Sequence, residues 1–259
     1  MSRIKNAFNK GKAFIAFLTC GDPDLATTAA VVREAVKNGA DLVELGIPCA
    51  NAMADGPVIQ AANKRALAGG TTVEKIFELV GALRKETAVP IVFMTYKDVV
   101  FDYGIENFLA SCEELGIDGL ILPDLSLEQR KKLVKLCHKY HVDLISLIAP
   151  VIDDGVKTVA QEAEGFIYVM SKRGLTGTPT EISANLISVV QLIKQSSNIP
   201  CCIGFGISTP EQAKAMAGLA DGVIVGSAII KLLAKYSKDA PRYVGAYVKS
   251  MKGAVKEAN

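Results

Sequence analysis

Two carboxylic acids, Glu44 and Asp55, are the side chains best placed to do acid–base chemistry. They stand in the segment ELGIPCANAMADGP, which carries no other charge. The chain has only two histidines, both in CHKYHV, and six cysteines without metal or redox spacing, so the carboxylates are the stronger candidates. Each also has a possible structural role: Glu44 in a salt-bridged network, and Asp55 in a turn built by Asp-Gly-Pro.

Eight short apolar runs recur along the chain and predict the elements that position these acids. None alternates polar with apolar residues, which is typical of parallel strands buried on both faces. The runs span residues 14–18, 42–45, 91–94, 119–122, 144–148, 166–170, 201–204 and 222–225.

The segments between the runs carry helix signals. STPEQ and SLEQ each place an N-cap residue, Thr209 or Ser126, three positions before a glutamine. Eight strand–helix units in 259 residues predict one α/β domain, residues 1–259, folded as a (β/α)8 TIM barrel. An open doubly wound sheet is the alternative, but eight strands would make it unusually wide. We also expect an extra N-terminal helix within residues 1–10 and a closing helix over about 235–257.

The two acids lie where an active site is expected in this fold. Active sites of such barrels lie at the carboxyl ends of the strands. Glu44 falls within the last residues of the second run, Asp55 lies in the following loop, and Tyr168 belongs to the sixth run, where packing is its alternative role. Three glycine-bearing loops, SKRGLTGTP, GFGIS and GSAIIK, converge on the same rim, and backbone N–H groups at a helix start bind anions. These loops therefore predict an anionic, phosphorylated substrate.

Composition restricts the partners. The 29 basic and 27 acidic residues nearly balance, which argues against a nucleic acid or a membrane surface recognised by bulk charge. No apolar run is long enough for a signal peptide or a membrane span. The sequence therefore predicts a cytoplasmic protein.

Eight segments in order resemble the α chain of tryptophan synthase: FLTCGDP, ELGIP, ADGPVIQ, MTYKDVVFDYG, LILPDL, FIYVMSKRGLTG, GFGIS and DGVIVGSAI. The resemblance covers essentially the whole chain. It implies a (β/α)8 barrel that cleaves indole-3-glycerol phosphate to indole and glyceraldehyde 3-phosphate, a retro-aldol reaction without a cofactor. It also implies docking on a β subunit that receives the indole.

The resemblance assigns roles to individual residues. Glu44 matches the catalytic glutamate, a general acid and base near C3 of the indole and the glycerol hydroxyl. Asp55 matches the second acid, which accepts the ring N–H and stabilises the positive charge formed on protonation. Tyr168 matches a tyrosine near the catalytic glutamate and is the third residue expected to be catalytic. The residues that match the substrate pocket are Phe17, Thr176, Gly177, Phe205, Gly206, Gly226 and Ser227. Phe17 is an apolar wall of the indole site, and Thr176 belongs to a loop expected to close over substrate.

Three segments depart from the family pattern, and in the family all three face the β subunit. The departing residues are Cys49, Ala50, Asn51, Ala52, Asp98, Val99 and Ser126. Drift or co-variation with an altered β subunit is one explanation, and a weakened or lost dependence on that subunit is the other. Other functions considered are another phosphate-binding barrel enzyme, such as indole-3-glycerol phosphate synthase or a sugar-phosphate isomerase, and a non-catalytic regulatory subunit.

Overall fold

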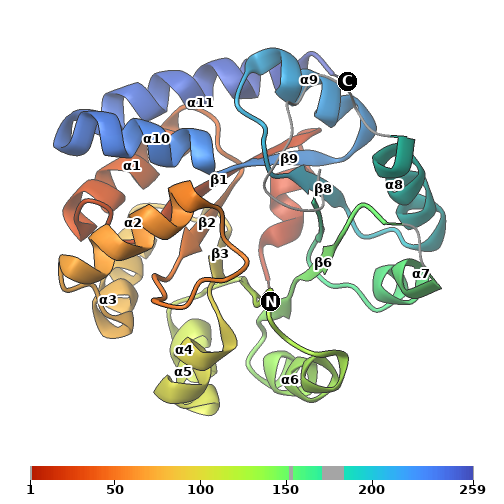
Figure 1. The fold of residues 1–259 in the computed structure, drawn as a ribbon, viewed down its shortest axis with the longest axis horizontal. Coiled ribbons are helices and arrows are strands. Elements are labelled where there is room, and N and C mark those ends of the chain that lie inside the picture. Colours follow the sequence, from red (N-terminus) through yellow and green to blue (C-terminus); the bar gives the residue numbers. More distant parts are fainter. Residues whose placement is uncertain (1, 152–153, 171–183, 259) are drawn as a thin grey trace.

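A computed structural model describes residues 2–151, 154–170 and 184–258 and contains one sheet of parallel strands surrounded by helices (Figure 1). The sheet order is β5-β4-β3-β2-β1-β9-β8-β7-β6. The strands are β1 (Ala13–Thr19), β2 (Leu42–Gly46), β3 (Ile91–Met94), β4 (Gly119–Ile121), β5 (Asp143–Leu144), β6 (Ser146–Ile148), β7 (Ile167–Met170), β8 (Cys201–Gly204) and β9 (Gly222–Val225).

The first and last strands in this order, β5 and β6, are separated only by Ile145. β5 pairs with β4 and β6 pairs with β7. The Ile145 N–H also donates to the carbonyl oxygen of Leu120 at 3.0 Å, which continues the ladder. The predicted run 144–148 is therefore one interrupted strand that closes the sheet. The (β/α)8 barrel is confirmed, and the open doubly wound alternative is wrong.

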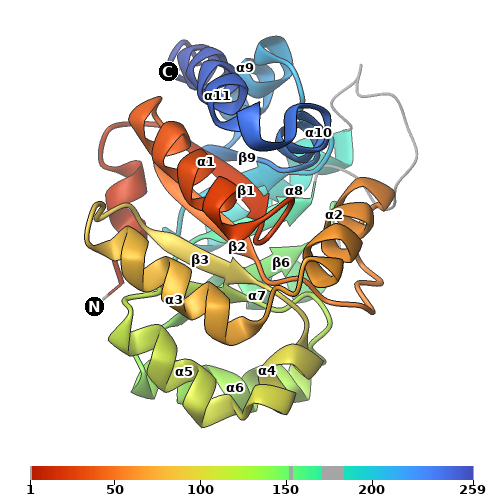
Figure 2. The ribbon, with the colours of Figure 1, turned by 90° about the vertical axis from the view of Figure 1, so that its left-hand side faces the viewer.

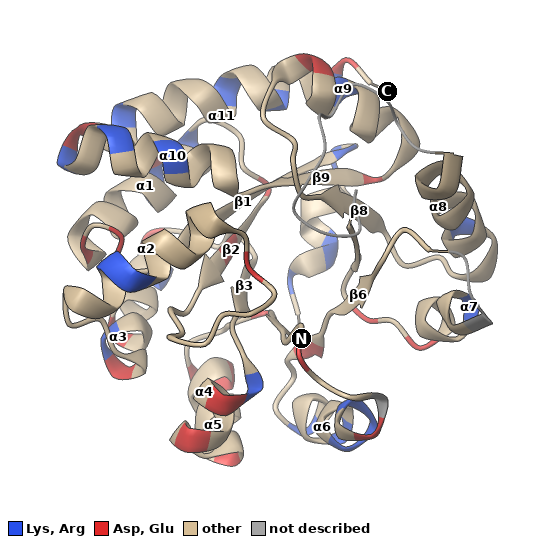
Figure 3. Ribbon diagram, viewed as in Figure 1, with Lys and Arg blue, Asp and Glu red and all other residues tan. Residues whose placement is uncertain are grey.

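Helices cover the outside of the barrel in the described chain (Figure 1). They are α1 (Leu25–Lys37), α2 (Pro57–Ala68), α3 (Val73–Arg84), α4 (Lys97–Tyr103), α5 (Ile105–Glu114), α6 (Leu127–Lys139), α7 (Asp154–Gln161), α8 (Ala184–Ser196), α9 (Pro210–Leu219), α10 (Ser227–Tyr236) and α11 (Ala240–Lys256). Charged residues of both signs lie mainly on these helices (Figure 3). No helix in the described ranges is long and apolar enough to cross a membrane.

Burial on both faces explains the uninterrupted apolar runs. Every residue of β1 and β2 is buried. Alternate residues such as Ile15 and Leu42 fill the barrel interior, whereas Phe14 and Val43 face the surrounding helices. Both predicted capping boxes are present, at Ser126 in front of α6 and at Thr209 in front of α9. Local sequence signals therefore agree with the tertiary fold.

The N-terminal segment lies at the end of the barrel opposite α2 (Figure 2). The helix predicted there is only a short 3-10 helix, η1 (Ile4–Phe8). Its Ile4 and Ala7 side chains belong to the inner cluster of the barrel. Arg3 anchors it, since its backbone N–H and Nε donate to Asp118 Oδ1 at 2.8 and 2.9 Å. The segment thus plugs the end away from the predicted site.

The closing helix also differs in extent from the prediction. α10 ends at Tyr236, a 3-10 turn (η2, Ser237–Asp239) follows, and α11 begins only at Ala240. Ser237 has a φ of 49°, a left-handed conformation that interrupts the helix. The chain therefore changes direction where the sequence predicts continuous helix from about 235.

Candidate active site

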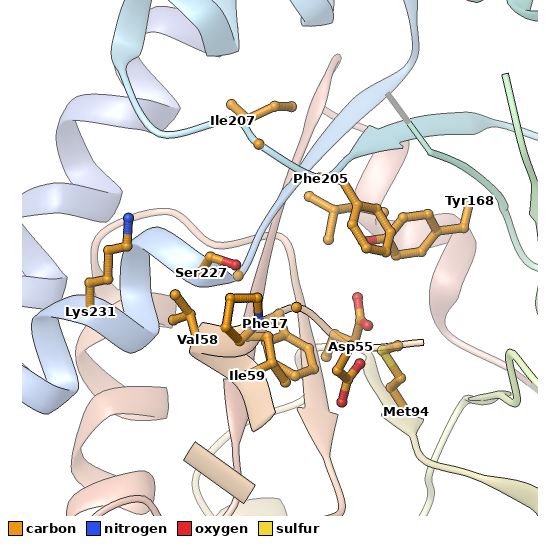
Figure 4. Close-up of a pocket in the computed structure, with 16 residues that line it drawn as sticks. Phe17, Asp55, Val58, Ile59, Met94, Tyr168, Phe205, Ile207, Ser227 and Lys231 are labelled. Carbon is orange, nitrogen blue, oxygen red and sulfur yellow. The ribbon is translucent and has the colours of Figure 1, made fainter. Parts of the chain in front are cut away.

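A cavity of about 300 Å³ lies at the carboxyl-terminal end of the barrel strands (Figure 4). Its lining includes eight of the predicted site residues: Phe17, Glu44, Asp55, Tyr168, Phe205, Gly206, Gly226 and Ser227. The other two, Thr176 and Gly177, lie outside the described residues. Residues from five strands or the loops after them thus meet in one pocket, as strand-end positions in a barrel predict.

Glu44 occupies the interior of the barrel on β2, in register with Phe17 on one side and Val92 on the other. It is fully buried, and neither carboxyl oxygen has a hydrogen-bond partner among the described residues. Burial, followed by the charge of Asp55, raises the pKa of Glu44 to about 8. The salt-bridged role is therefore not supported. Glu44 is instead a carboxylic acid that holds its proton at neutral pH.

Asp55 is held in a different environment, in the loop between β2 and α2. Burial raises its pKa to about 6, while hydrogen bonds from Tyr96 and Asn63 oppose that rise. Asn63 Nδ2 donates to Asp55 Oδ2 at 3.2 Å. The Asp55 N–H donates to the carbonyl oxygen of Ala52 at 3.2 Å, so its backbone also forms a turn. At neutral pH this side chain is mainly a carboxylate.

Tyr168 and Phe205 form one wall of the pocket. Their rings meet edge to face with centroids 5.7 Å apart. Burial, followed by the charge of Glu44, keeps the pKa of Tyr168 well above its ordinary value, so the phenol stays neutral. A Cβ on Gly204 would lie 2.6 Å from Cε1 of this tyrosine. Gly204 is therefore needed for the ring position, although the sequence did not single it out.

Phe17 forms the opposite apolar wall, and two glycines make space for it. A Cβ on Gly46 would lie 2.8 Å from its Cζ, and a Cβ on Gly226 would lie 3.0 Å from its Cδ1. The loop after β8 has a strained backbone, because Phe205 has a φ of 70° and is followed by Gly206 with a φ of 78°. A non-glycine residue with positive φ is uncommon and clusters at ligand sites. The glycine-bearing loops thus also shape the aromatic walls.

The lining contains further residues that the sequence patterns did not indicate. They are Gly56, Pro57, Val58, Ile59, Met94, Ile207, Ile224 and Lys231. Met94 ends a predicted strand, so its position was a usable signal. Lys231 follows Ser227 by one helical turn, and that spacing places both on one face of α10. The other residues line the pocket only because α2 and the barrel strands pack together, and the sequence carries no separate signal for them.

The two ends of the pocket differ in charge. Glu44 and Asp55 lie in its inner part, whereas the start of α10, with Gly226 as N-cap, lies at the other side. Helix N-termini favour anions. Within the described residues, no group of three or more His, Cys, Asp or Glu side chains is arranged to hold a metal ion. Fold and site define a (β/α)8-barrel protein with an acid pair in an apolar pocket whose far end suits an anion.

Comparison with known proteins identifies the family. Residues 4–258 match the family model for the tryptophan synthase alpha chain. The tryptophan synthase alpha chain of Lacticaseibacillus casei is 48% identical over 255 residues, covering 98% of this chain and 96% of that protein. The corresponding protein of Alkaliphilus metalliredigens (strain QYMF) is 49% identical over 220 residues, covering 85% and 83%.

A solved structure agrees with these relatives. Tryptophan synthase subunit alpha from Legionella pneumophila str. Paris matches with a TM-score of 0.89 at 33% identity, covering 99% of each chain. The chain therefore belongs to the tryptophan synthase alpha chain family. The family comprises lyases of tryptophan biosynthesis, which cleave indole-3-glycerol phosphate to indole and glyceraldehyde 3-phosphate and pair with a β subunit. The other barrel enzymes and the non-catalytic subunit are not favoured.

Proposed function

We propose that Glu44 and Asp55 are the catalytic acids of this lyase and that their opposite protonation states divide the work. The supporting observation is that two carboxyl groups of one pocket have pKa values of about 8 and about 6. Near pH 7, Glu44 is available as an acid and Asp55 as an anion. Environments that move the pKa values of two carboxyl groups apart in this way are typical of acid–base sites.

The proposed cleavage begins with proton transfer from Glu44 to C3 of the indole ring. The positive charge that develops on the ring nitrogen is stabilised by the Asp55 carboxylate, which accepts the ring N–H. The bond from C3 to the glycerol carbon then breaks and its electrons return to the ring. The ionised Glu44 takes the proton of the adjacent hydroxyl as the aldehyde forms. Glu44 is thereby restored to its protonated state.

The remaining predicted residues bind the substrate in this proposal. Phe17, Tyr168 and Phe205 enclose the indole ring between apolar surfaces. Gly206, Gly226 and Ser227 receive the phosphate at the start of α10, where backbone N–H groups favour an anion. Thr176 and Gly177 stay predictions for the loop 171–180, which lies outside the described residues.

Indole release from indole-3-glycerol phosphate tests the acid pair. Glu44→Gln and Asp55→Asn keep the shape of each side chain but remove its acid–base function. We expect each to lower the rate by roughly 10²–10⁴-fold, the usual contribution of a positioned acid or base. Glu78→Gln, an exposed site on α3, is the matched control. If Glu44→Gln kept the wild-type rate, Glu44 would not be the proton donor.

We propose that the altered rim still binds a β subunit whose surface has changed with it. Ala50, Asn51, Asp98 and Ser126 are exposed, and Cys49 and Val99 are half-buried. Ala52 is buried, and its carbonyl oxygen accepts from Gln60 Nε2 at 3.2 Å, so this residue lies inside the loop and not on the exposed rim.

Two exposed apolar side chains near these segments support a protein partner. Met53 is 89% exposed and Phe101 is 38% exposed. Large apolar surface is typical of interaction sites, and a bound β subunit would cover these two side chains in this proposal. Indole release measured with and without a standard β subunit separates the two explanations. A rate strongly raised by the subunit is expected, whereas a full rate from the isolated chain that the subunit does not change would favour an independent lyase.

We propose the cytoplasm as the site of action. All six cysteines are free thiols, and five of them are buried. Free cysteines fit a reducing compartment, since disulfides form and persist in oxidising ones. Fractionation of the source cells with a specific antibody tests this location, and recovery outside the cytoplasmic fraction would contradict it.

A further inference from the structure

Lys231 is the only basic residue among the described residues that line the pocket. It lies on α10, four positions after Ser227, so the two side chains share one face of the helix. Figure 4 shows Ser227 and Lys231 on this side of the pocket and Asp55 on the other side of Phe17. The cation and the catalytic carboxylate thus lie at opposite ends of the same cavity.

The charge of Lys231 is available to a ligand. The side chain is exposed, and no carboxylate of the described residues forms an ion pair with it. Other lysines of the chain are paired, for example Lys214 with Glu257 at 2.9 Å and Lys252 with Asp41 at 2.6 Å. Lys231 therefore adds a positive charge that no carboxylate of the described ranges pairs with, one turn after the N-terminal end of α10, which itself favours an anion.

We propose that Lys231 recognises the phosphate of the substrate and thereby sets the direction in which the substrate enters. This inference rests on the proposed function. A phosphate dianion is attracted to Lys231 and repelled by the Asp55 carboxylate, so the uncharged ring is left at the acid end. The phosphate keeps its charge throughout the cleavage. Lys231 therefore stabilises substrate and transition state equally, which lowers KM without raising kcat.

Steady-state kinetics of Lys231→Met test this role against Lys235→Met. Lys235 lies one turn further along the same helix and does not line the pocket. We expect Lys231→Met to raise KM for indole-3-glycerol phosphate by roughly three- to ten-fold with kcat changed less than two-fold, as for a partly screened ion pair. Lys231→Arg should restore most of the affinity, and added salt should raise KM less in Lys231→Met than in the wild type. An unchanged KM, or an equal fall in kcat, would overturn the inference.

A binding measurement separates this inference from the proposed function. Glycerol 3-phosphate and glycerol are titrated into the wild type, Lys231→Met and Lys235→Met by calorimetry. Weaker binding of glycerol 3-phosphate in Lys231→Met alone supports the role of Lys231, even if the wild type releases no indole and the proposed reaction fails. Equal binding by all three proteins, or no binding to the wild type, overturns the role of Lys231. If the wild type releases indole but all three proteins bind glycerol 3-phosphate equally, the proposed reaction holds and the role of Lys231 does not.

Discussion

Replacing Glu44 by glutamine should slow catalysis by roughly 10²–10⁴-fold and at the same time stabilise the folded protein at neutral and alkaline pH. The folded protein holds the Glu44 proton up to about pH 8, whereas an unperturbed glutamate loses it near 4.5. Between these values the unfolded chain binds fewer protons than the folded one, so wild-type stability falls as the pH rises. Glutamine has no proton to lose, and the variant escapes this penalty.

The size of the effect follows from the pKa change. A rise from 4.5 to about 8 corresponds, at about 1.4 kcal/mol per pKa unit, to about 3 kcal/mol at pH 7 and about 5 kcal/mol well above pH 8. The glutamine amide is also buried without a partner, but its cost does not depend on pH. The stability difference between variant and wild type should therefore grow by about 3.5 kcal/mol between pH 5 and pH 8.

Urea unfolding at pH 5 and pH 8 measures this difference. Glu128→Gln, a change at an exposed side chain on α6, should alter the free energy of unfolding by less than about 0.5 kcal/mol at both values. A stability difference for Glu44→Gln that stayed the same at pH 5 and pH 8 would refute the reasoning. It would mean that Glu44 is not held as a protonated acid in the folded protein.

The same geometry gives three further predictions. The kcat/KM for cleavage should fall below a pH of about 6 as Asp55 is protonated and above about 8 as Glu44 ionises; a pH–rate profile without an alkaline limb would contradict this assignment. Asn63→Ala removes a hydrogen bond that lowers the pKa of Asp55, so the acid limb should move to higher pH by up to about one unit; an unmoved limb would show that this hydrogen bond does not tune the acid. Gly204→Ala should cost about 1–3 kcal/mol of stability and reduce indole release, because its Cβ would displace Tyr168; calorimetry and the indole assay would show wild-type values if the backbone absorbs the methyl group.

The sequence by itself determined the strands, their parallel arrangement and the end of the barrel at which chemistry occurs. Strands buried on both faces must be apolar throughout, so β1 and β2 were visible as short unbroken runs. Glu44 was noticeable because glutamate is rarely buried in an apolar interior, and here it falls within the last residues of such a run. The carboxyl end of a parallel strand then fixed its location.

The sequence was less informative where a feature depends on packing between distant segments. The strand 144–148 is interrupted at Ile145, which only pairing with both β4 and β7 reveals. The N-terminal helix is shorter than predicted, because Ile4 and Ala7 enter the barrel interior and Arg3 is held by Asp118. Such contacts join residues far apart in the chain and leave no periodic signal.

Only the tertiary structure decided how the two acids differ. Glu44 and Asp55 are both carboxyl groups, and their sequence positions do not reveal their protonation. Full burial, with no hydrogen-bond partner in the part of the chain that the structure describes, keeps Glu44 protonated, whereas hydrogen bonds from Asn63 and Tyr96 counteract the burial of Asp55. A pKa depends on the solvent and charges that the folded chain places around a group. The sequence therefore identifies the acid pair, and the fold assigns one member as the acid and the other as the anion.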